Sequence, residues 1–329
     1  MTTLMIYGAT GYTGRMTAEH AAEQGVNLVL AGRDVDRLAH LADRLGVGYR
    51  AFSLDDSASV DRALANTTAL LNCAGPFQRT ARPLMTAAVR SGVDYLDVAA
   101  ELDSYLLAEE LDADARAADV MLLPGSGGSV AMLGCLARQV AQRVTHATHL
   151  RIAMHVAGSM SRGSAISAAE NLTTTCLRRL DGALTAQDPS TTWNFDFGRG
   201  PQTCSPATLP DLVTIWHATK IPDIETFVHA SGDAFPQGDL SDLPEGPTLE
   251  QREANRYHAA AEVTGADGTV TRAVLDTVNG YTFTPMAATE AAIRVLRGER
   301  QPGFHTPAAL FGSGFAETIA DTRIRQLGV

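Results

Sequence analysis

Lysine is almost absent from this chain of 329 residues, because Lys220 is the single lysine among 26 basic residues. Cysteine is also scarce, and its four positions lie far apart without a C-x-x-C pair. That spacing argues against a zinc cage and against a thioredoxin-type redox motif. We therefore expect Cys73, Cys135, Cys176 and Cys204 to be reduced and structural.

Two further absences bear on location and partners. No stretch approaches the roughly 18 apolar residues of a membrane span, and no basic leader precedes the apparent strand at Leu4. The sequence therefore predicts a cytoplasmic protein with no membrane partner. The formal net charge of −11 provides no overall basic field, so no nucleic-acid partner is expected either.

The composition that remains is that of a globular protein, with 45% hydrophobic and 19% charged residues. At about 150 residues per domain, the length predicts two domains. Residues 1–125 alternate short apolar runs with amphipathic segments, which is typical of a parallel sheet wrapped by helices. The expected strands are Leu4–Tyr7, Asn27–Ala31, Tyr49–Leu54, Ala69–Cys73, Tyr95–Val98 and Val120–Leu123. We predict the α/β class, with a Rossmann doubly wound sheet over residues 1–125.

The remaining residues follow a different pattern. Helices are expected at about Ser129–Arg143, Ala165–Leu184 and Pro285–Arg297, and strands at Leu150–Val156, Thr192–Phe197, Glu225–Ala230 and in an Ala259–Val278 hairpin turning at Asp267-Gly268. This pattern predicts a second domain of the α+β class after the Rossmann domain. We expect the strands of this domain to form an antiparallel sheet. The helices Ser129–Arg143 and Ala165–Leu184 are too few to cover both of its faces, so we expect a homodimer through this sheet.

A glycine-rich turn carries the main functional signal. Gly8-Ala9-Thr10-Gly11-Tyr12-Thr13-Gly14 follows the first expected strand and opens a helix. Glycines allow the backbone to approach a pyrophosphate closely, and the helix N-terminus offers free N–H groups to it. We predict cofactor contacts at Gly8, Thr10, Gly11, Tyr12, Thr13 and Gly14. The alternative is a purely structural glycine turn.

The end of the second strand indicates which dinucleotide binds. An acidic residue about 20 positions after the glycine turn would hold the ribose of NAD, but Gly32-Arg33 stands there. Arginine suits a 2′-phosphate, so NADP is favoured over NAD. Alternatively, Arg33 stacks on adenine or pairs with Asp34.

Two more loops at carboxyl ends of strands are expected near the cofactor. Asp55 follows the third strand and could reach adenine, although Asp56 or Ser57 could instead cap the next helix. After the fourth strand, the small residues Cys73, Ala74 and Gly75 permit close backbone approach to the second half of the cofactor.

The scarcity of lysine excludes one reductase mechanism. Short-chain reductases need a tyrosine with a lysine four residues later, and Trp216 occupies the position four before Lys220. A hydride-transfer enzyme built on this turn must therefore use other groups.

Several motifs together resemble one family. Besides Gly8–Gly14 and Ala31-Gly32-Arg33, they are the Asn72–Gln78 loop, Tyr95-Leu96-Asp97-Val98-Ala99-Ala100-Glu101, Leu123-Pro124-Gly125-Ser126-Gly127 and, weakly, Gly303-Phe304-His305-Thr306-Pro307. The chain resembles the saccharopine dehydrogenase-like reductases, particularly their trans-acting enoyl reductase branch. The resemblance covers the N-terminal third well. It implies a Rossmann domain over residues 1–125 that residues 285–329 complete, with a substrate and dimerisation domain of the α+β class inserted over residues 126–284. It also implies reduction of a C=N or C=C bond by NAD(P)H.

One departure from the family pattern concerns the chemistry. Ser129 and Gly134 stand where the family carries acids that could orient substrate or move protons. Candidate catalytic residues are then Glu101, after the fifth strand, and Ser129; Glu101 or Asp103 could instead cap the next helix. No metal is expected, because His146, His149 and His155 are not accompanied by an acidic third ligand.

These observations predict an NADPH-dependent oxidoreductase. It would transfer hydride to an imine or an activated C=C bond of a small-molecule substrate. The alternative is a catalytically silent NADP(H)-binding sensor or accessory protein, as the loss of acids at Ser129 and Gly134 suggests.

Overall fold

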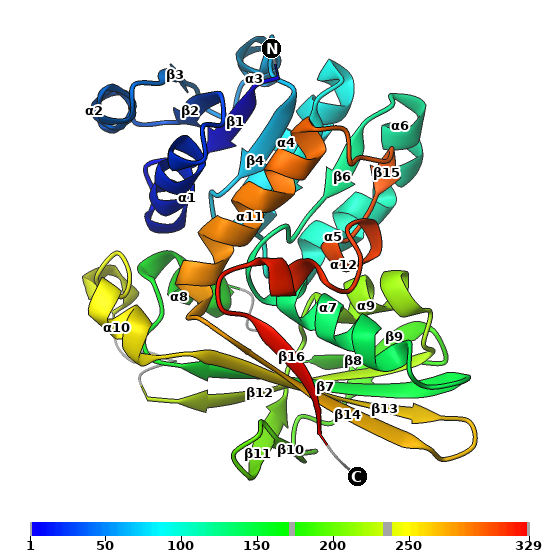
Figure 1. Ribbon diagram of the computed structural model, residues 1–329. Coiled ribbons are helices and arrows are strands. Elements are labelled where there is room, and N and C mark those ends of the chain that lie inside the picture. Colours follow the sequence, from blue (N-terminus) through cyan, green and yellow to red (C-terminus); the bar gives the residue numbers. More distant parts are fainter. Residues whose placement is uncertain (1, 171–174, 233–238, 328–329) are drawn as a thin grey trace. The chain divides into compact units, whose positions relative to one another are not determined.

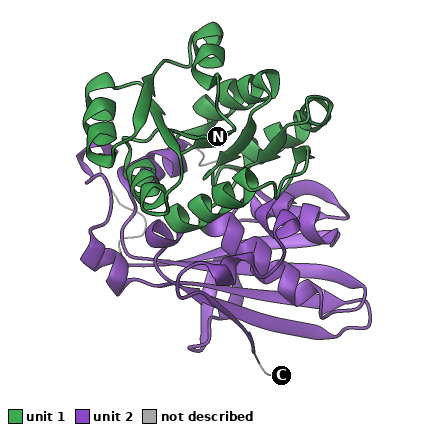
Figure 2. Cartoon of the chain, turned by 45° about the horizontal axis from the view of Figure 1, so that its top comes forward, with its two compact units in different colours: residues 1–128, 284–305 green, residues 129–283, 306–329 purple. Residues whose placement is uncertain are grey.

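The computed structural model describes residues 2–170, 175–232 and 239–327 (Figure 1). The chain divides into two compact units, coloured separately in Figure 2. Unit 1 comprises Met1–Gly128 and Thr284–His305, and unit 2 comprises Ser129–Phe283 and Thr306–Val329. Each unit is built around one β-sheet.

The sheet of unit 1 has seven parallel strands in the order β15-β6-β5-β4-β1-β2-β3. The strands are β1 (Leu4–Tyr7), β2 (Leu28–Gly32), β3 (Gly48–Ala51), β4 (Ala69–Asn72), β5 (Asp94–Asp97), β6 (Met121–Leu123) and β15 (Gly303–Phe304). The order reverses between β1 and β4, where open sheets of this kind bind their ligands. The predicted α/β class with a doubly wound parallel sheet is confirmed.

Helices connect these strands. They are α1 (Tyr12–Glu23), α2 (Val35–Leu45), α3 (Ser57–Leu64), α4 (Phe77–Ser91), α5 (Leu102–Glu110), α6 (Asp112–Ala117) and most of α11 (Gly280–Leu296). α2 shows both predicted ends: the Asp34 carboxylate accepts from the N–H of Arg37 at 3.0 Å, and Gly46 closes the helix at a φ of 66°. α11 begins five residues before the predicted start at Pro285, which lies inside the helix.

The sheet of unit 2 is mixed, in the order β10-β11-β12-β7-β13-β14-β16, with β8 and β9 attached through β12. The strands are β7 (Ala147–Ala157), β8 (Cys176–Leu180), β9 (Ala183–Gln187), β10 (Trp193–Asp196), β11 (Pro201–Pro206), β12 (Asp223–Ser231), β13 (Tyr257–Gly265), β14 (Val270–Thr277) and β16 (Arg323–Leu327). The prediction of a purely antiparallel sheet was wrong at its centre, because β12 and β7 pair in parallel.

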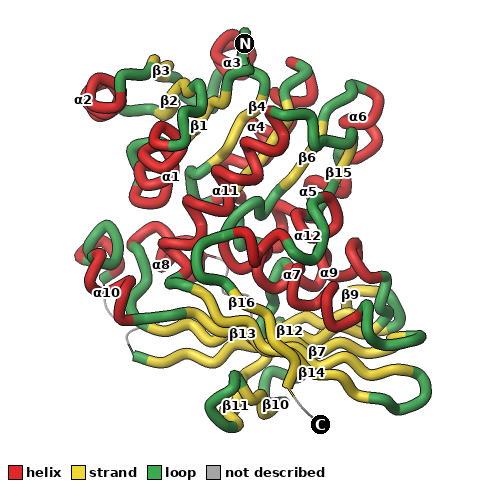
Figure 3. The backbone as a smooth tube through the Cα atoms, in the orientation of Figure 1, coloured by secondary structure: helices red, strands yellow, loops and turns green. Residues whose placement is uncertain are grey.

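Five α-helices of unit 2 are α7 (Gly128–Ala141), α8 (Arg162–Glu170), α9 (Asp211–Thr219), α10 (Leu249–Ala254) and α12 (Pro307–Leu310). Figure 3 shows α7 and α9 along one side of the sheet. The long helix predicted over Ala165–Leu184 was wrong: α8 ends at Glu170, residues 171–174 lie outside the described residues, and a β-hairpin follows. Asp181 and Gly182 form its two-residue turn, with positive φ values of 50° and 79°.

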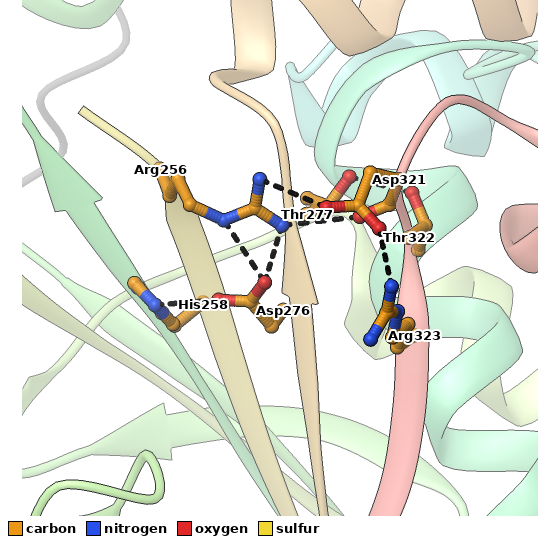
Figure 4. Close-up of polar contacts among 7 residues, drawn as sticks. All are labelled: Arg256, His258, Asp276, Thr277, Asp321, Thr322 and Arg323. Carbon is orange, nitrogen blue, oxygen red and sulfur yellow. Dashed lines mark hydrogen bonds and ion pairs between the residues drawn. The ribbon is translucent and has the colours of Figure 1, made fainter. Parts of the chain in front are cut away.

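The C-terminal segment differs from expectation as well. From Thr306 onward the chain groups with unit 2 and does not complete unit 1, because β16 pairs with β14. Polar side-chain contacts also hold the C-terminal segment against unit 2 (Figure 4). Arg256, which directly precedes β13, bonds the carboxylate of Asp276 and lies 3.4 Å from that of Asp321, while the hydroxyls of Thr277 and Thr322 are 2.6 Å apart.

Candidate cofactor site

The turn between β1 and α1 is built from glycines for steric reasons. Gly8 has a φ of +79°, and a Cβ atom on it would lie 2.8 Å from the Cβ atom of Ala74. A Cβ atom on Gly14 would lie 2.1 Å from the carbonyl oxygen of Gly8, so the helix can pack this closely on the turn only with glycine there. Gly11 is the N-cap residue and provides no side-chain cap.

This geometry brings the predicted contact residues together at one helix N-terminus. Thr10 and Gly11 form the turn, and Tyr12, Thr13 and Gly14 are the first three residues of α1. The first N–H groups of a helix have no acceptor within the helix, and the helix dipole adds positive potential there. The turn can therefore bind a pyrophosphate through backbone groups.

The loop after β4 lies directly beside this turn. The N–H of Cys73 donates to the carbonyl of Tyr7 at 2.8 Å, and Ala74 contacts Gly8. The side chain of Asn72 fixes the loop by accepting from the N–H of Ala74 at 3.0 Å. Burial raises the pKa of the Cys73 thiol to about 12, so this thiol stays neutral and is no nucleophile. Cys73, Ala74 and Gly75 thus offer backbone and small side chains.

Arg33 and Asp55 lie at the same edge of the sheet, after β2 and β3. Both act on the hydroxyl of Tyr7: burial raises its pKa, Arg33 lowers it and Asp55 raises it. Asp55 accepts a hydrogen bond from the Ser53 hydroxyl at 2.6 Å. Helix capping is performed by its neighbour Asp56, whose carboxylate accepts from the N–H of Ala58 at 3.1 Å. Arg33 is exposed, so its guanidinium can reach a phosphate.

A second arginine at this edge escaped the sequence analysis. Arg37, one helical turn after Arg33, donates from Nη2 to the carbonyl oxygen of Thr10 at 2.8 Å. It thereby joins the start of α2 to the glycine turn. The signal that could have revealed it is the four-residue spacing, which places both side chains on one face of the chain as the helix begins.

Glu101 has a defined but incomplete set of partners. Its residue is 6% exposed, and its Oε2 atom accepts from the N–H of Gln78 at 2.9 Å, in the first turn of α4. Although Glu101 is the N-cap residue of α5, its side chain therefore caps a different helix. Its Oε1 atom is buried and has no hydrogen-bond partner among the described residues.

The other candidate catalytic residue belongs to unit 2. Ser129 is the second residue of α7 and is half-buried. Further along the helix, a Cβ atom on Gly134 would lie 3.2 Å from that of Ala308. The packing of α7 against Ala308 leaves little room for an acid at position 134. Glu101 and Ser129 thus fall in different units.

Sequence reasoning also missed a buried polar network beside the cofactor turn. The Oδ1 atom of Asp97 accepts from the N–H groups of Ala99 at 3.0 Å and Gly125 at 2.7 Å, and its Oδ2 atom accepts from the Tyr95 hydroxyl at 2.9 Å. Burial raises the pKa of Asp97 to about 6, these hydrogen bonds lower it, and the charge of Glu101 raises it. The signal was present in the sequence as a polar residue inside an apolar strand.

Two further features are absent from the described ranges. No three or more His, Cys, Asp or Glu side chains within residues 2–170, 175–232 and 239–327 are grouped to hold a metal ion. Among the helices in this part of the chain, none has the length and apolar character needed to cross a bilayer.

Comparison with known proteins agrees with this geometry. Residues 4–123, which include the glycine turn, Arg33 and Asp97, match the family model of the saccharopine dehydrogenase NADP binding domain. The predicted resemblance is thereby confirmed for this NADP binding domain, and the family name agrees with the cofactor predicted from Arg33.

Similar proteins share this region. The trans-acting enoyl reductase of Mycobacterium leprae (strain TN) is 33% identical over 106 residues, covering 30% of this chain and 25% of that protein. The enzyme of the same name from Mycobacterium ulcerans (strain Agy99) is 32% identical with the same coverage. The match spans about a quarter of the length of these relatives.

A solved structure resembles the whole fold. Apo saccharopine dehydrogenase (L-Glu forming) from Saccharomyces cerevisiae superposes with a TM-score of 0.68 over 100% of both chains, at 13% sequence identity. The NADP binding domain and unit 2 therefore both occur in a known arrangement of elements. At this level of identity the likeness concerns the fold.

Proposed function

We propose that this chain is an NADPH-dependent oxidoreductase that transfers hydride to an imine or an activated C=C bond of a small molecule. One observation carries the proposal: a glycine turn and helix N-terminus lie at the reversal of strand order, with Arg33 after the neighbouring strand. The N–H groups of α1 would bind the pyrophosphate, and Arg33 the 2′-phosphate. Asp55 would face the adenine side, and the Cys73–Gly75 loop the second half of the cofactor.

When bound, NADPH supplies the hydride. The chain must supply a proton to the nitrogen or to the neighbouring carbon of the reduced bond. Glu101 is the first candidate for orienting or protonating the substrate, because one of its oxygens is anchored and the other has no partner among the described residues. Ser129 is the second candidate, as a hydroxyl that could bind substrate.

Titration of both cofactors tests the binding step. NADPH should bind more tightly than NADH, and Arg33→Ser should weaken NADPH by about tenfold while leaving NADH nearly unchanged. Arg90→Ser is the control, because Arg90 is an exposed arginine of unit 1 paired with Asp61 on α3. Tighter binding of NADH than NADPH by the wild-type chain would reject the assignment.

A second candidate function has its own observation. The acids that the family carries are replaced by Ser129 and by Gly134, which packs against Ala308. That favours a catalytically silent NADP(H)-binding sensor or accessory protein. NADPH oxidation in the presence of imines, enoyl esters and 2-oxo acids separates the two functions. Tight binding without oxidation of NADPH by any of these substrates would favour the silent protein.

A homodimer through the sheet of unit 2 and a cytoplasmic location remain predictions. Light scattering at micromolar concentration tests the first, and a stable monomer would contradict it. Fractionation of cells that produce the protein tests the second.

A further inference from the structure

A chain of buried hydrogen bonds joins the carboxyl ends of three strands in unit 1. From the loop after β6, the N–H groups of Gly125 and Ser126 donate to the side chain and the carbonyl of Asp97, each at 2.7 Å. From β5, Tyr95 donates to Asp97 and accepts from Asn72 of β4 at 3.2 Å. Asp97 and Asn72 are both 0% exposed, so water does not compete for these bonds.

The chain of bonds ends at the cofactor turn. Asn72 holds the N–H of Ala74 at 3.0 Å, and Thr80 donates to the carbonyl of Ala74 at 2.6 Å. Ala74 in turn occupies the space that a side chain on Gly8 would need. The position of the loop after β4 relative to the glycine turn therefore depends on bonds that lead back to Asp97.

We propose that Asp97 is a positioning residue for the cofactor. As a carboxylate it holds the loops after β5 and β6 and, through Tyr95 and Asn72, the loop after β4 against the glycine turn, and its protonation weakens NADPH binding. Hydrogen bonds to a charged acceptor are stronger than bonds to a neutral one, so a protonated Asp97 holds these N–H groups less firmly. This inference rests on the proposed binding of NADPH.

The groups that face Asp97 determine where it titrates. Burial raises its pKa to about 6, the bonds from Gly125, Ala99 and Tyr95 lower it, and the nearby charge of Glu101 raises it. The Cys73 thiol also faces it and stays neutral, because burial and the Asp97 charge both raise its pKa, to about 12. Tyr95 stays neutral too, since burial and Asp97 raise its pKa well above 10.0, with Tyr105 adding to this.

Protonation of Asp97 has opposite effects on the stability of the fold and on the binding of NADPH. The native pKa of about 6 lies above the ordinary value of 3.8, so protonation of Asp97 increases the free energy of unfolding as the pH falls through 6. If protonation of Asp97 lowers the affinity for NADPH at pH 5, unfolding of the protein is therefore not the cause. This separates a positioning role from a merely structural one.

The experiment measures the dissociation constant of NADPH between pH 5 and 8 for the wild type, Asp97→Asn, Tyr95→Phe and Glu101→Gln. The 2′-phosphate of NADPH itself titrates near pH ~6, so the wild type is compared with Asp97→Asn, which keeps that contribution. We expect the wild-type affinity to fall by about tenfold more than that of Asp97→Asn between pH 8 and pH 5.

The two neighbours should move the midpoint in opposite directions. Tyr95→Phe removes a hydrogen bond that lowers the pKa of Asp97, so the midpoint moves to higher pH. Glu101→Gln removes a charge that raises it, so the midpoint moves to lower pH. These two variants keep the test decisive if Asp97→Asn does not fold.

Parallel pH curves for the wild type and Asp97→Asn would overturn the inference, as would midpoint shifts of the same sign in both neighbour variants. Wild-type binding of NADPH that is tight and independent of pH would overturn the inference alone. No binding of NADPH at pH 8 would overturn the proposed function together with it.

Discussion

Gly8 and Ala74 lie so close together that a Cβ atom on Gly8 would come within 2.8 Å of the Cβ atom of Ala74. One residue follows β1 and the other belongs to the loop after β4, so their contact joins the two loops at the reversal of strand order. A side chain at position 8 would separate these loops. The cofactor turn is thus specified by tertiary packing as well as by its own backbone.

Gly8→Ala should lower the stability of the protein and its affinity for NADPH together. The positive φ of Gly8 and the contact with Ala74 predict a loss of about 1–3 kcal/mol in the free energy of unfolding. Gly11→Ala is the matched control, because its φ is −75° and its nearest contact is 3.4 Å away. Thermal unfolding measures the stability of both variants, and titration measures their affinity for NADPH. Equal melting temperatures for the two variants would contradict the role of Gly8.

Arg37→Ala should weaken NADPH and NADH by the same factor, about fivefold. Its guanidinium bonds the carbonyl of Thr10, so its loss loosens the turn that binds the pyrophosphate common to both cofactors. Parallel titrations with Arg33→Ser distinguish the two arginines. A loss confined to NADPH in Arg37→Ala would mean that Arg37 binds the 2′-phosphate itself.

Asp211→Asn should change how stability depends on pH. Asp211 is 0% exposed, its carboxylate oxygens have no hydrogen-bond partner in any other described residue, and burial raises its pKa to about 7 although its own N–H lowers it. The native pKa lies above the ordinary 3.8, so the protonated form stabilises the fold, and that stability is lost as the pH rises from 3.8 through 7.

Asparagine cannot ionise, so the stability of Asp211→Asn relative to the wild type should increase over this range and level off above pH 7. The increase is on the order of 4 kcal/mol. Urea unfolding at several pH values measures it. Asp188→Asn is the control, because Asp188 is exposed and bonds with Ser190 lower its pKa. A constant difference between Asp211→Asn and the wild type would refute the buried-acid interpretation.

His155→Gln should reduce the sensitivity of the protein to acid. Burial lowers the pKa of His155 to about 4, and the neighbouring His229, His258 and Arg199 lower it further. The native pKa lies below the ordinary 6.5, so His155 contributes stability above pH 6.5 that is lost as the pH falls through 4.

The denaturant midpoints at pH 7.5 and pH 5 should therefore lie closer together in His155→Gln than in the wild type. His40→Gln, at an exposed position on α2, should leave the difference unchanged. The prediction fails if both variants keep the wild-type difference.

Local sequence signals were sufficient for the parallel sheet and for the glycine turn. Short apolar runs between turn residues located β1 without error and the next five strands to within a few residues. The pairing partner of a segment was harder to predict. The stretch around Leu180 has helical spacing of its leucines, yet Asp181 and Gly182 form a hairpin turn that allows β8 and β9 to pair.

Two residues of the candidate site could not be predicted, because their roles also depend on contacts between distant parts of the chain. Arg37 is an ordinary exposed helix residue by sequence, and only the fold brings it to Thr10. Asp97 was noticed within a motif, but its role depends on Gly125, which lies 28 residues later in the chain. Contacts over such separations leave no periodic pattern in one sequence.

The short strand β15 determines whether the N-terminal segment can exist by itself. Gly303 and Phe304 cover the edge of β6, whose residues Met121, Leu122 and Leu123 are all 0% exposed. Residues 1–128 contain the whole glycine turn and Asp97, but they lack these two residues. Produced alone, they would present an apolar, unpaired strand edge, which is a template for self-association. The segment that resembles a complete NADP binding domain would therefore aggregate unless the distant strand is supplied.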